Sequence, residues 1–163
     1  MADIVDTFDR ENKPKNTFAL EVLDELGNFV TRTVSHNSRV QAGGAALHAA
    51  IFGGTGIAFK YIALSNNASL APANTDTTLS GEIVTSGLTR QAGTVTLGTS
   101  QASLNGTVTT TITASWSAGA AFTIYGGGAF SAISSGTLGF ESTCTATPVS
   151  TGYTVNLTWT FNE

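Results

Sequence analysis

The chain has 163 residues, of which 41% are hydrophobic and only 11% are charged, and its net charge is −4. This length suffices for one domain with a real core, and so neutral a composition argues against a disordered chain. The seven basic residues are scattered, which argues against nucleic-acid binding. No apolar run is long enough to cross a membrane, and no signal peptide is recognisable, so we expect the chain to be made and folded in a cytoplasm.

Charge is distributed unevenly along the chain. Charged residues crowd the first quarter, and after Arg90 only Glu141 and Glu163 are charged. A surface so poor in charge is weakly protected against association. We therefore predict an extended N-terminal arm over residues 1–16 and a single β domain over residues 17–163, much of it covered by other subunits.

The predicted arm combines alternating charges with one proline and few apolar side chains. It is either a mobile acidic terminus or an arm that becomes ordered on a neighbouring subunit. In the second interpretation Ile4, Val5 and Phe8 are its apolar anchors, and Arg10 is a further candidate contact.

The first predicted elements are a hairpin and a helix. Thr17–Leu23 and Phe29–Val34 alternate apolar and polar residues around a Gly-Asn turn, which is typical of a β-hairpin. A helix is predicted over Arg39–Phe52, with Ser38 or Asn37 as a possible N-cap and two glycines after its end.

A strand at Phe59–Leu64 is followed by a polar loop at Ser65–Asn74 and by one helical turn at Thr75–Leu79. The Thr/Gly-rich remainder predicts sheet, with glycine-containing breaks that include Gly126–Gly128. The expected strands are Leu88–Leu97, Ala102–Trp116, Ala121–Tyr125, Ala129–Ile133, Leu138–Thr145 and Tyr153–Phe161.

The last of these strands has the clearest pattern, because large apolar side chains alternate with threonine and asparagine. We place it at the centre of a sheet. The spacing of the strands predicts a mainly β fold, an antiparallel β-sandwich (jelly-roll-like) with one α-helix packed at an edge or end.

Catalytic and metal-binding patterns are missing from the sequence. The two histidines, His36 and His48, lie before the β body, and no pair of carboxylates stands out. The single cysteine, Cys144, excludes an intrachain disulfide framework and lies in a strand pattern typical of a buried thiol. We therefore expect no enzyme activity, no cofactor, no metal and no small-molecule substrate.

Several segments carry a family resemblance: RVQAGGAALHAAIFGG, FKYIALSNN, APANTDTTLSGEI, GLTRQAGTVTL and GTLGFESTCTATPVSTGYTVNLTWTF. In this order the chain resembles a diffuse family of virion structural proteins of tailed bacteriophages, over about residues 39–97 and 136–161. The chain departs from the family before the last strand, where Gly152-Tyr153 replaces an acidic residue. The resemblance implies a structural virion component and transfers no active site.

The resemblance and the composition together predict a capsid decoration (cement) protein. It is expected to form a homotrimer or another homo-oligomer in the virion and to grip the major capsid protein or other virion subunits. Besides the arm, the candidate contacts are Asn66, Asn67, Pro72, Asp76 and Arg90. We expect Arg90 to pair with Glu82 or with a neighbouring subunit, and its substitution by alanine to weaken assembly more than folding.

Two alternatives remain open from the sequence. One is a tail-fibre or tail-tip module that binds a receptor or glycan, in which Tyr125, Phe130 and Tyr153 stack on sugars unless they pack in the core. The other is a tail-tube or connector subunit, which would form rings or tubes.

Overall fold

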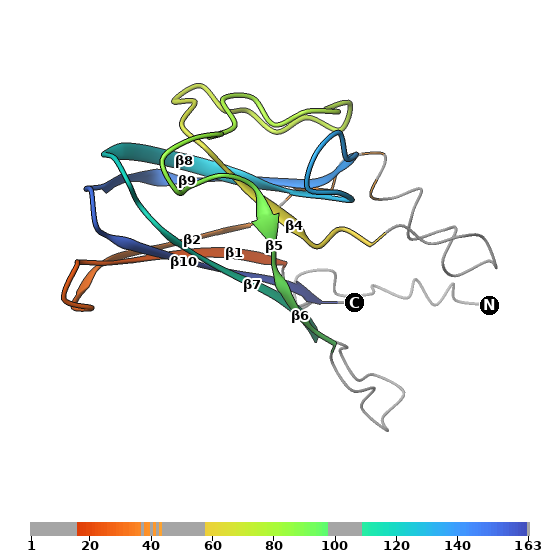
Figure 1. Cartoon of the computed structure of the whole chain (residues 1–163). Coiled ribbons are helices and arrows are strands. Elements are labelled where there is room, and N and C mark those ends of the chain that lie inside the picture. Colours follow the sequence, from red (N-terminus) through yellow and green to blue (C-terminus); the bar gives the residue numbers. More distant parts are fainter. Residues whose placement is uncertain are drawn as a thin grey trace, which may run out of the picture.

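The computed structural model describes residues 16–36, 38–39, 41, 43, 58–97 and 109–162. These residues are mainly β and form two antiparallel sheets (Figure 1). Their strands are β1 (Thr17–Leu23), β2 (Phe29–His36), β3 (Ser38–Arg39), β4 (Tyr61–Ser65), β5 (Gln91–Ala92), β6 (Thr94–Thr96), β7 (Thr109–Ser117), β8 (Phe122–Phe130), β9 (Leu138–Val149) and β10 (Thr154–Asn162).

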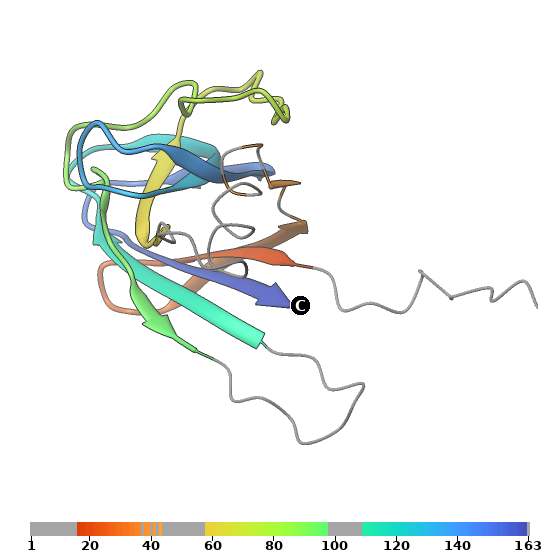
Figure 2. The same ribbon diagram turned by 90° about the vertical axis from the view of Figure 1, so that its right-hand side faces the viewer.

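The two sheets face each other in a sandwich-like arrangement (Figures 1 and 2). The first sheet has the order β2-β1-β10-β7-β6, and the second has the order β3-β9-β8-β4-β5. Their inner faces enclose a hydrophobic core in which Phe18 and Trp159 meet edge to face, with ring centroids 5.1 Å apart. The predicted central position of the last strand is confirmed, because β10 is the third of five strands and Val155, Leu157 and Trp159 are buried.

Two stretches of chain take part in both sheets. β2 pairs with β1 in the first sheet. β3 begins two residues after the end of β2 and pairs with β9 in the second sheet. On the opposite side β5 pairs with β4, and β6 pairs with β7. Strands that switch sheets in this way form the corners of a sandwich. Both sides of the body are therefore bridged by the chain itself.

The turn between β1 and β2 confirms the predicted hairpin. Asp24 Oδ1 accepts hydrogen bonds from the N–H groups of Leu26 and Asn28, and Gly27 has φ +81°. Glycine adopts this left-handed conformation without the clash that a Cβ atom causes.

The predicted strand Leu88–Leu97 is wrong as a single element. Gly93 divides it into β5 and β6, and its N–H donates to the carbonyl oxygen of Lys60 at 2.7 Å. A Cβ atom here would lie 2.5 Å from Ile112 Cγ2. Glycine is needed where the chain passes from one sheet to the other, because the Cβ atom of any larger residue would collide with β7.

Gly126–Gly128 was predicted to break the sheet, but these residues lie within the continuous strand β8. Cβ atoms at Gly126 and Gly128 would press on Leu70 and Leu138, whereas one at Gly127 would press on the Phe18 ring. The glycines are explained by tight packing on both faces of the strand and not by a turn.

The predicted helix is not supported at its start, because Arg39 belongs to β3. Hydrogen bonding to β9, a long-range contact, overrides the local capping pattern there. Of the rest of the predicted helix, only Gln41 and Gly43 are described, and both are helical, while the extent of the helix lies outside the described residues. Residues 1–15 of the predicted arm, including Ile4, Val5, Phe8 and Arg10, lie outside the described residues.

Candidate functional site

The most elaborate irregular segment is the loop from Ser65 to Gly87, called the 65–87 loop below. It passes over the outer face of the second sheet, above β8 and β9 (Figures 1 and 2). A second, smaller apolar cluster lies under it and contains Ala63, Leu79, Phe130 and Leu138, with Tyr61 and Leu70 at its margin. The loop therefore has a small core of its own against the sheet.

Hydrogen bonds give the loop a defined shape. The Ser65 side chain is buried and donates to the carbonyl oxygen of Ser80 at 2.6 Å. Asn67 Oδ1 accepts from the Ser69 N–H, while its Nδ2 donates to Ser80 Oγ at 2.8 Å. The two ends of the loop are joined by the bond from the Ile83 N–H to the Leu64 carbonyl oxygen. A loop with this many internal bonds presents a preformed surface.

The helical turn predicted at Thr75–Leu79 is absent. Asp76 Oδ2 accepts a hydrogen bond from the Ala73 N–H at 2.6 Å, and the Asp76 N–H donates to the Ala73 carbonyl oxygen. This local bonding by an aspartate competes with helix formation. Asp76 is therefore held in a turn that directs it toward β9.

Asp76 lies beside Glu141 of β9, a carboxyl group that is 1% exposed. Burial, followed by the hydrogen bond with Asp76 and the charge of Asp76, raises the pKa of Glu141 from 4.5 to about 7. The Oε2 atom of Glu141 is buried and has no hydrogen-bond partner. A protonated Glu141 can donate to Asp76, whereas an ionised one would place two negative charges together.

Arg90 ties the loop to the sheet. Its Nε and one terminal nitrogen donate to the two Glu82 carboxylate oxygens, at 2.9 and 2.6 Å, and its other terminal nitrogen donates to the Ala132 carbonyl oxygen. The guanidinium carbon lies 3.4 Å from the centroid of the Phe130 ring. The predicted pairing with Glu82 is confirmed, and it engages the guanidinium within the chain.

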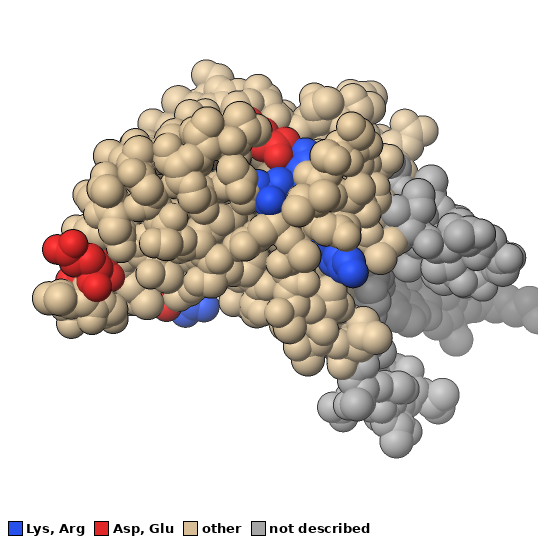
Figure 3. Space-filling view, in the orientation of Figure 1, with Lys and Arg blue, Asp and Glu red and all other residues tan. Residues whose placement is uncertain are grey.

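The exposed surface is mostly uncharged in the view of Figure 3. Between residues 41 and 162 the charged residues are Lys60, Asp76, Glu82, Arg90 and Glu141. Glu141 is buried, and Glu82 is paired with Arg90. Several large apolar side chains are exposed instead: Leu26, Phe29, Val30, Val34, Val84, Val95, Leu97 and Ile133. Depletion of charged residues is a property of the buried centres of protein interfaces.

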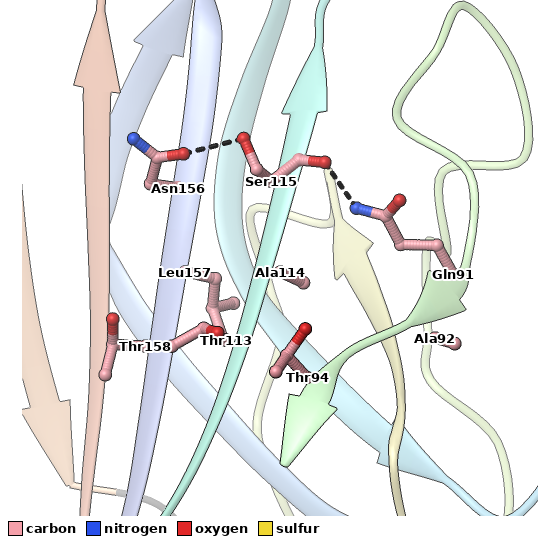
Figure 4. A pocket seen from close by; sticks show the side chains of 9 residues that line it. All are labelled: Gln91, Ala92, Thr94, Thr113, Ala114, Ser115, Asn156, Leu157 and Thr158. Carbon is pink, nitrogen blue, oxygen red and sulfur yellow. Dashed lines mark hydrogen bonds between the residues drawn. The ribbon is translucent and has the colours of Figure 1, made fainter. Parts of the chain in front are cut away.

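A shallow groove of about 430 Å³ lies on the first sheet beside β5 and β6 (Figure 4). Its lining is neutral and rich in hydroxyl and amide groups. Ser115 Oγ donates to Asn156 Oδ1 at 2.7 Å, and Gln91 Nε2 donates to the Ser115 carbonyl oxygen at 2.6 Å. The other lining residues are Ala92, Thr94, Thr113, Ala114, Leu157 and Thr158. Such a groove offers hydrogen bonds but no charge and no aromatic face.

The predicted contact residues of the loop have different environments. Asn66 is exposed, whereas Asn67, Pro72 and Asp76 are partly buried. Arg90 has a side chain that is only 12% exposed. Of these five residues, only Asn66 is exposed.

The aromatic residues proposed for sugar stacking are not freely available. Phe130 is buried under Arg90, while Tyr125 and Tyr153 are half-buried, and Tyr153 packs against the main core. For Phe130 the stacking interpretation is wrong, because the outer face of its strand is covered by the loop.

The sequence analysis gave no site role to Glu141 or Val84. Glu141 had one signal, as the only charge between Arg90 and Glu163. Val84, 68% exposed, follows the buried Ile83 and carries no pattern that separates it from a core residue.

Within the described residues, no group of three or more His, Cys, Asp and Glu side chains could hold a metal ion. No helix in the same part of the chain is long and apolar enough to cross a membrane. Cys144 is half-buried, and burial raises the pKa of its thiol to about 11, which suppresses the reactive thiolate.

Comparisons with protein-family models, with curated proteins and with solved structures found no match to this chain.

Proposed function

We propose that the protein is a non-enzymatic structural component of a bacteriophage virion, and specifically a capsid decoration protein that binds neighbouring capsid subunits. The observation that carries the proposal is the nearly uncharged surface of the β body, with its exposed apolar side chains. Charged residues are depleted at the centres of protein interfaces, so a body of this composition suits a subunit covered by others.

Three further features support this proposal. The chain crosses between the two sheets on both sides of the body, so the body is a single unit that neighbouring subunits can contact. The 65–87 loop offers a preformed surface with Asn66 and Val84 exposed. The charged first quarter of the sequence supplies an arm to a neighbouring subunit.

A finer description of the fold is part of the same proposal. The pairs β1·β10, β3·β9, β4·β8 and β6·β7 are nested in sequence from the outside to the inside. This nesting supports a jelly-roll-like sandwich, an architecture that viral capsid proteins use.

Deletion of residues 2–16 tests the proposal. The truncated protein should lose binding to undecorated capsids, because the apolar anchors are gone, and should keep a folded β body. Co-sedimentation with capsids measures binding, and circular dichroism measures folding. Binding that is unchanged after the deletion would contradict the proposal.

Substitutions within the arm separate anchors from charges. Alanine at Ile4, Val5 and Phe8 together should reduce capsid binding at least tenfold, which corresponds to about 1.4 kcal/mol. Asparagine at Asp3 and Asp6 serves as the matched control and should change binding less.

The groove on the first sheet favours one alternative, a tail module that binds a neutral glycan. Its hydroxyl and amide side chains could bond to sugar hydroxyl groups. A glycan array with the wild type and with Gln91→Ala and Asn156→Ala tests this. A glycan bound by the wild type and lost in both variants would favour the tail module over the decoration protein.

The tail-tube or connector subunit remains the third candidate. Electron microscopy of the purified protein tests it, because rings or tubes without capsids would favour that role.

A further inference from the structure

We infer that a proton on Glu141, donated in a hydrogen bond to Asp76, holds the segment of the 65–87 loop around Asp76 against the second sheet, and that loss of this proton releases the segment. The inference concerns the folding of this chain and does not depend on the proposed virion function. It starts from the positions of the two carboxyl groups, one on a strand and the other on the loop.

Within the described part of the second sheet, the residues next to Glu141 are neutral. Its register partners are Gly128 of β8 and Ser38 of β3. Along β9, the next residues on its side are Gly139 and Thr143. Of the described side chains, Asp76 is therefore the titratable group that faces Glu141 from the elements packed against it.

One cation among the described side chains also has to be considered. Arg90 contacts the same sheet through Phe130, but its guanidinium is paired with Glu82. Among the described side chains, none is therefore left to neutralise Glu141, and we assign that role to a proton.

The unpartnered Oε2 atom indicates which carboxyl group holds the proton. In an ionised Glu141 this buried oxygen would carry part of a negative charge with no donor to stabilise it. In a protonated Glu141 the charge is absent, and the O–H group can donate to Asp76. Asp76 is only partly buried and already accepts a hydrogen bond from the Ala73 N–H. The proton therefore resides on Glu141.

A divalent cation in place of the proton fits the site less well. Calcium takes about six to eight oxygen ligands, several of them carboxylates. Among the described residues, no third acidic side chain, histidine or cysteine lies with Asp76 and Glu141 in a group that could hold a metal ion. A proton satisfies two facing carboxyl groups without further ligands.

The loop is the element that responds when the proton leaves. Around Asp76, the apolar contacts of the loop with the sheet come from Leu79, which is buried, and from Leu70, at the margin of the smaller cluster. Two facing carboxylates would repel each other at the same contact. The segment around Asp76 contacts the smaller cluster, whereas Ile83 of the loop lies in the main core, so this segment can open while Ile83 and the β body stay in place.

The direction of the pH dependence follows from the raised pKa of Glu141. The docked state binds the proton more tightly than the open state, whose Glu141 has an ordinary value near 4.5. Docking is therefore strongest below pH 4.5, where Glu141 is protonated in both states. It weakens as the pH rises and becomes constant above about pH 7, where the docked state also loses the proton.

Amide hydrogen exchange across pH 4 to 9, corrected for intrinsic exchange rates, tests this. Protection factors of amides in residues 66–80 should fall by up to about tenfold per pH unit between roughly pH 5 and 7. Amides of β10 should show no such fall. Protection of the loop that does not change with pH would overturn the inference.

Two variants locate the proton. Glu141→Gln keeps a neutral side chain that can donate to Asp76, so protection of the loop should no longer depend on pH. Asp76→Asn removes the facing charge but not the burial of Glu141, so the midpoint of the pH dependence should move to lower pH. Glu25→Gln, at an exposed carboxylate of the β1–β2 turn, is the matched control and should behave as the wild type.

A direct titration covers the case in which Glu141→Gln does not fold. The side-chain carbonyl ¹³C resonance of Glu141 in the wild type should titrate well above the ordinary range of glutamate. Titration in the ordinary range would overturn the inference. Restoration of protection at pH 8 by calcium chloride in the wild type, but not in Glu141→Gln, would overturn it in favour of a cation.

Discussion

Arg90 holds three parts of the chain together through one side chain. It joins Glu82 at the end of the loop, the Ala132 carbonyl oxygen after β8, and the face of the Phe130 ring. Lysine cannot replace it, because a single ammonium group cannot bond both carboxylate oxygens in the same planar geometry. At the residue scale, the structure therefore assigns Arg90 a part in folding.

Arg90→Ala should lower the free energy of unfolding by about 2–4 kcal/mol, because it leaves the Glu82 carboxylate without its cation and uncovers Phe130. Arg90→Lys should retain part of this stability. Urea denaturation measures both, with Lys60→Ala at an exposed cation as the control, expected within about 0.5 kcal/mol of the wild type. A loss for Arg90→Ala no larger than that of the control would contradict this role, and the expected effect on assembly stays a prediction.

At the scale of elements, β8 shows why three glycines occur in succession within a strand. The strand is packed on both faces, since Phe18 of the first sheet lies on one side and the loop with Leu70 and Leu79 on the other. Glycine normally weakens a strand, but here the absence of side chains lets both layers approach. The 65–87 loop can lie close to the sheet for this reason.

Gly127→Ala should destabilise the protein by about 1–3 kcal/mol, since its Cβ atom would lie 2.7 Å from the Ala63 carbonyl oxygen and 3.0 Å from the Phe18 ring. Thermal unfolding measures the effect. Thr113→Ala, at an exposed position of β7, is the control and should shift the midpoint little. Equal midpoints for the two variants would show that the strand relaxes without cost.

At the scale of the whole molecule, the connections between the two sheets make them a single folding unit. Their residues share one core cluster, and the chain crosses between the sheets on both sides of the body. If one sheet unfolds, the inner apolar face of the other sheet is exposed to water. We therefore expect the domain to unfold in a single cooperative step.

One probe in each sheet tests this expectation. Tryptophan fluorescence reports on Trp116 and Trp159 of the first sheet, and thiol labelling at pH 8 reports on Cys144 of the second. Labelling of the folded protein should be slow, because the pKa of Cys144 is raised to about 11. The two denaturation curves should coincide, and labelling that precedes the fluorescence change would indicate independent sheets.

Local patterns in the sequence determined the strands whose side chains alternate. The hairpin β1–β2, β7 from residue 109 onward and β10 were predicted correctly, because burial of one face requires a period of two and this period is visible in the residues. The pairing of Arg90 with Glu82 was likewise within reach, because two opposite charges stand eight positions apart in a nearly uncharged segment.

Only the tertiary structure decided which glycines break a strand and which permit close packing, because a glycine has no side chain whose polarity shows what lies beside it. The division at Gly93, the continuity of β8 and the crossing of β2–β3 between sheets all depend on partners far away in the sequence. The facing carboxyl groups of Asp76 and Glu141 are of the same kind. They meet because a loop folds back over a strand that follows it by more than fifty positions, and no local pattern records that contact.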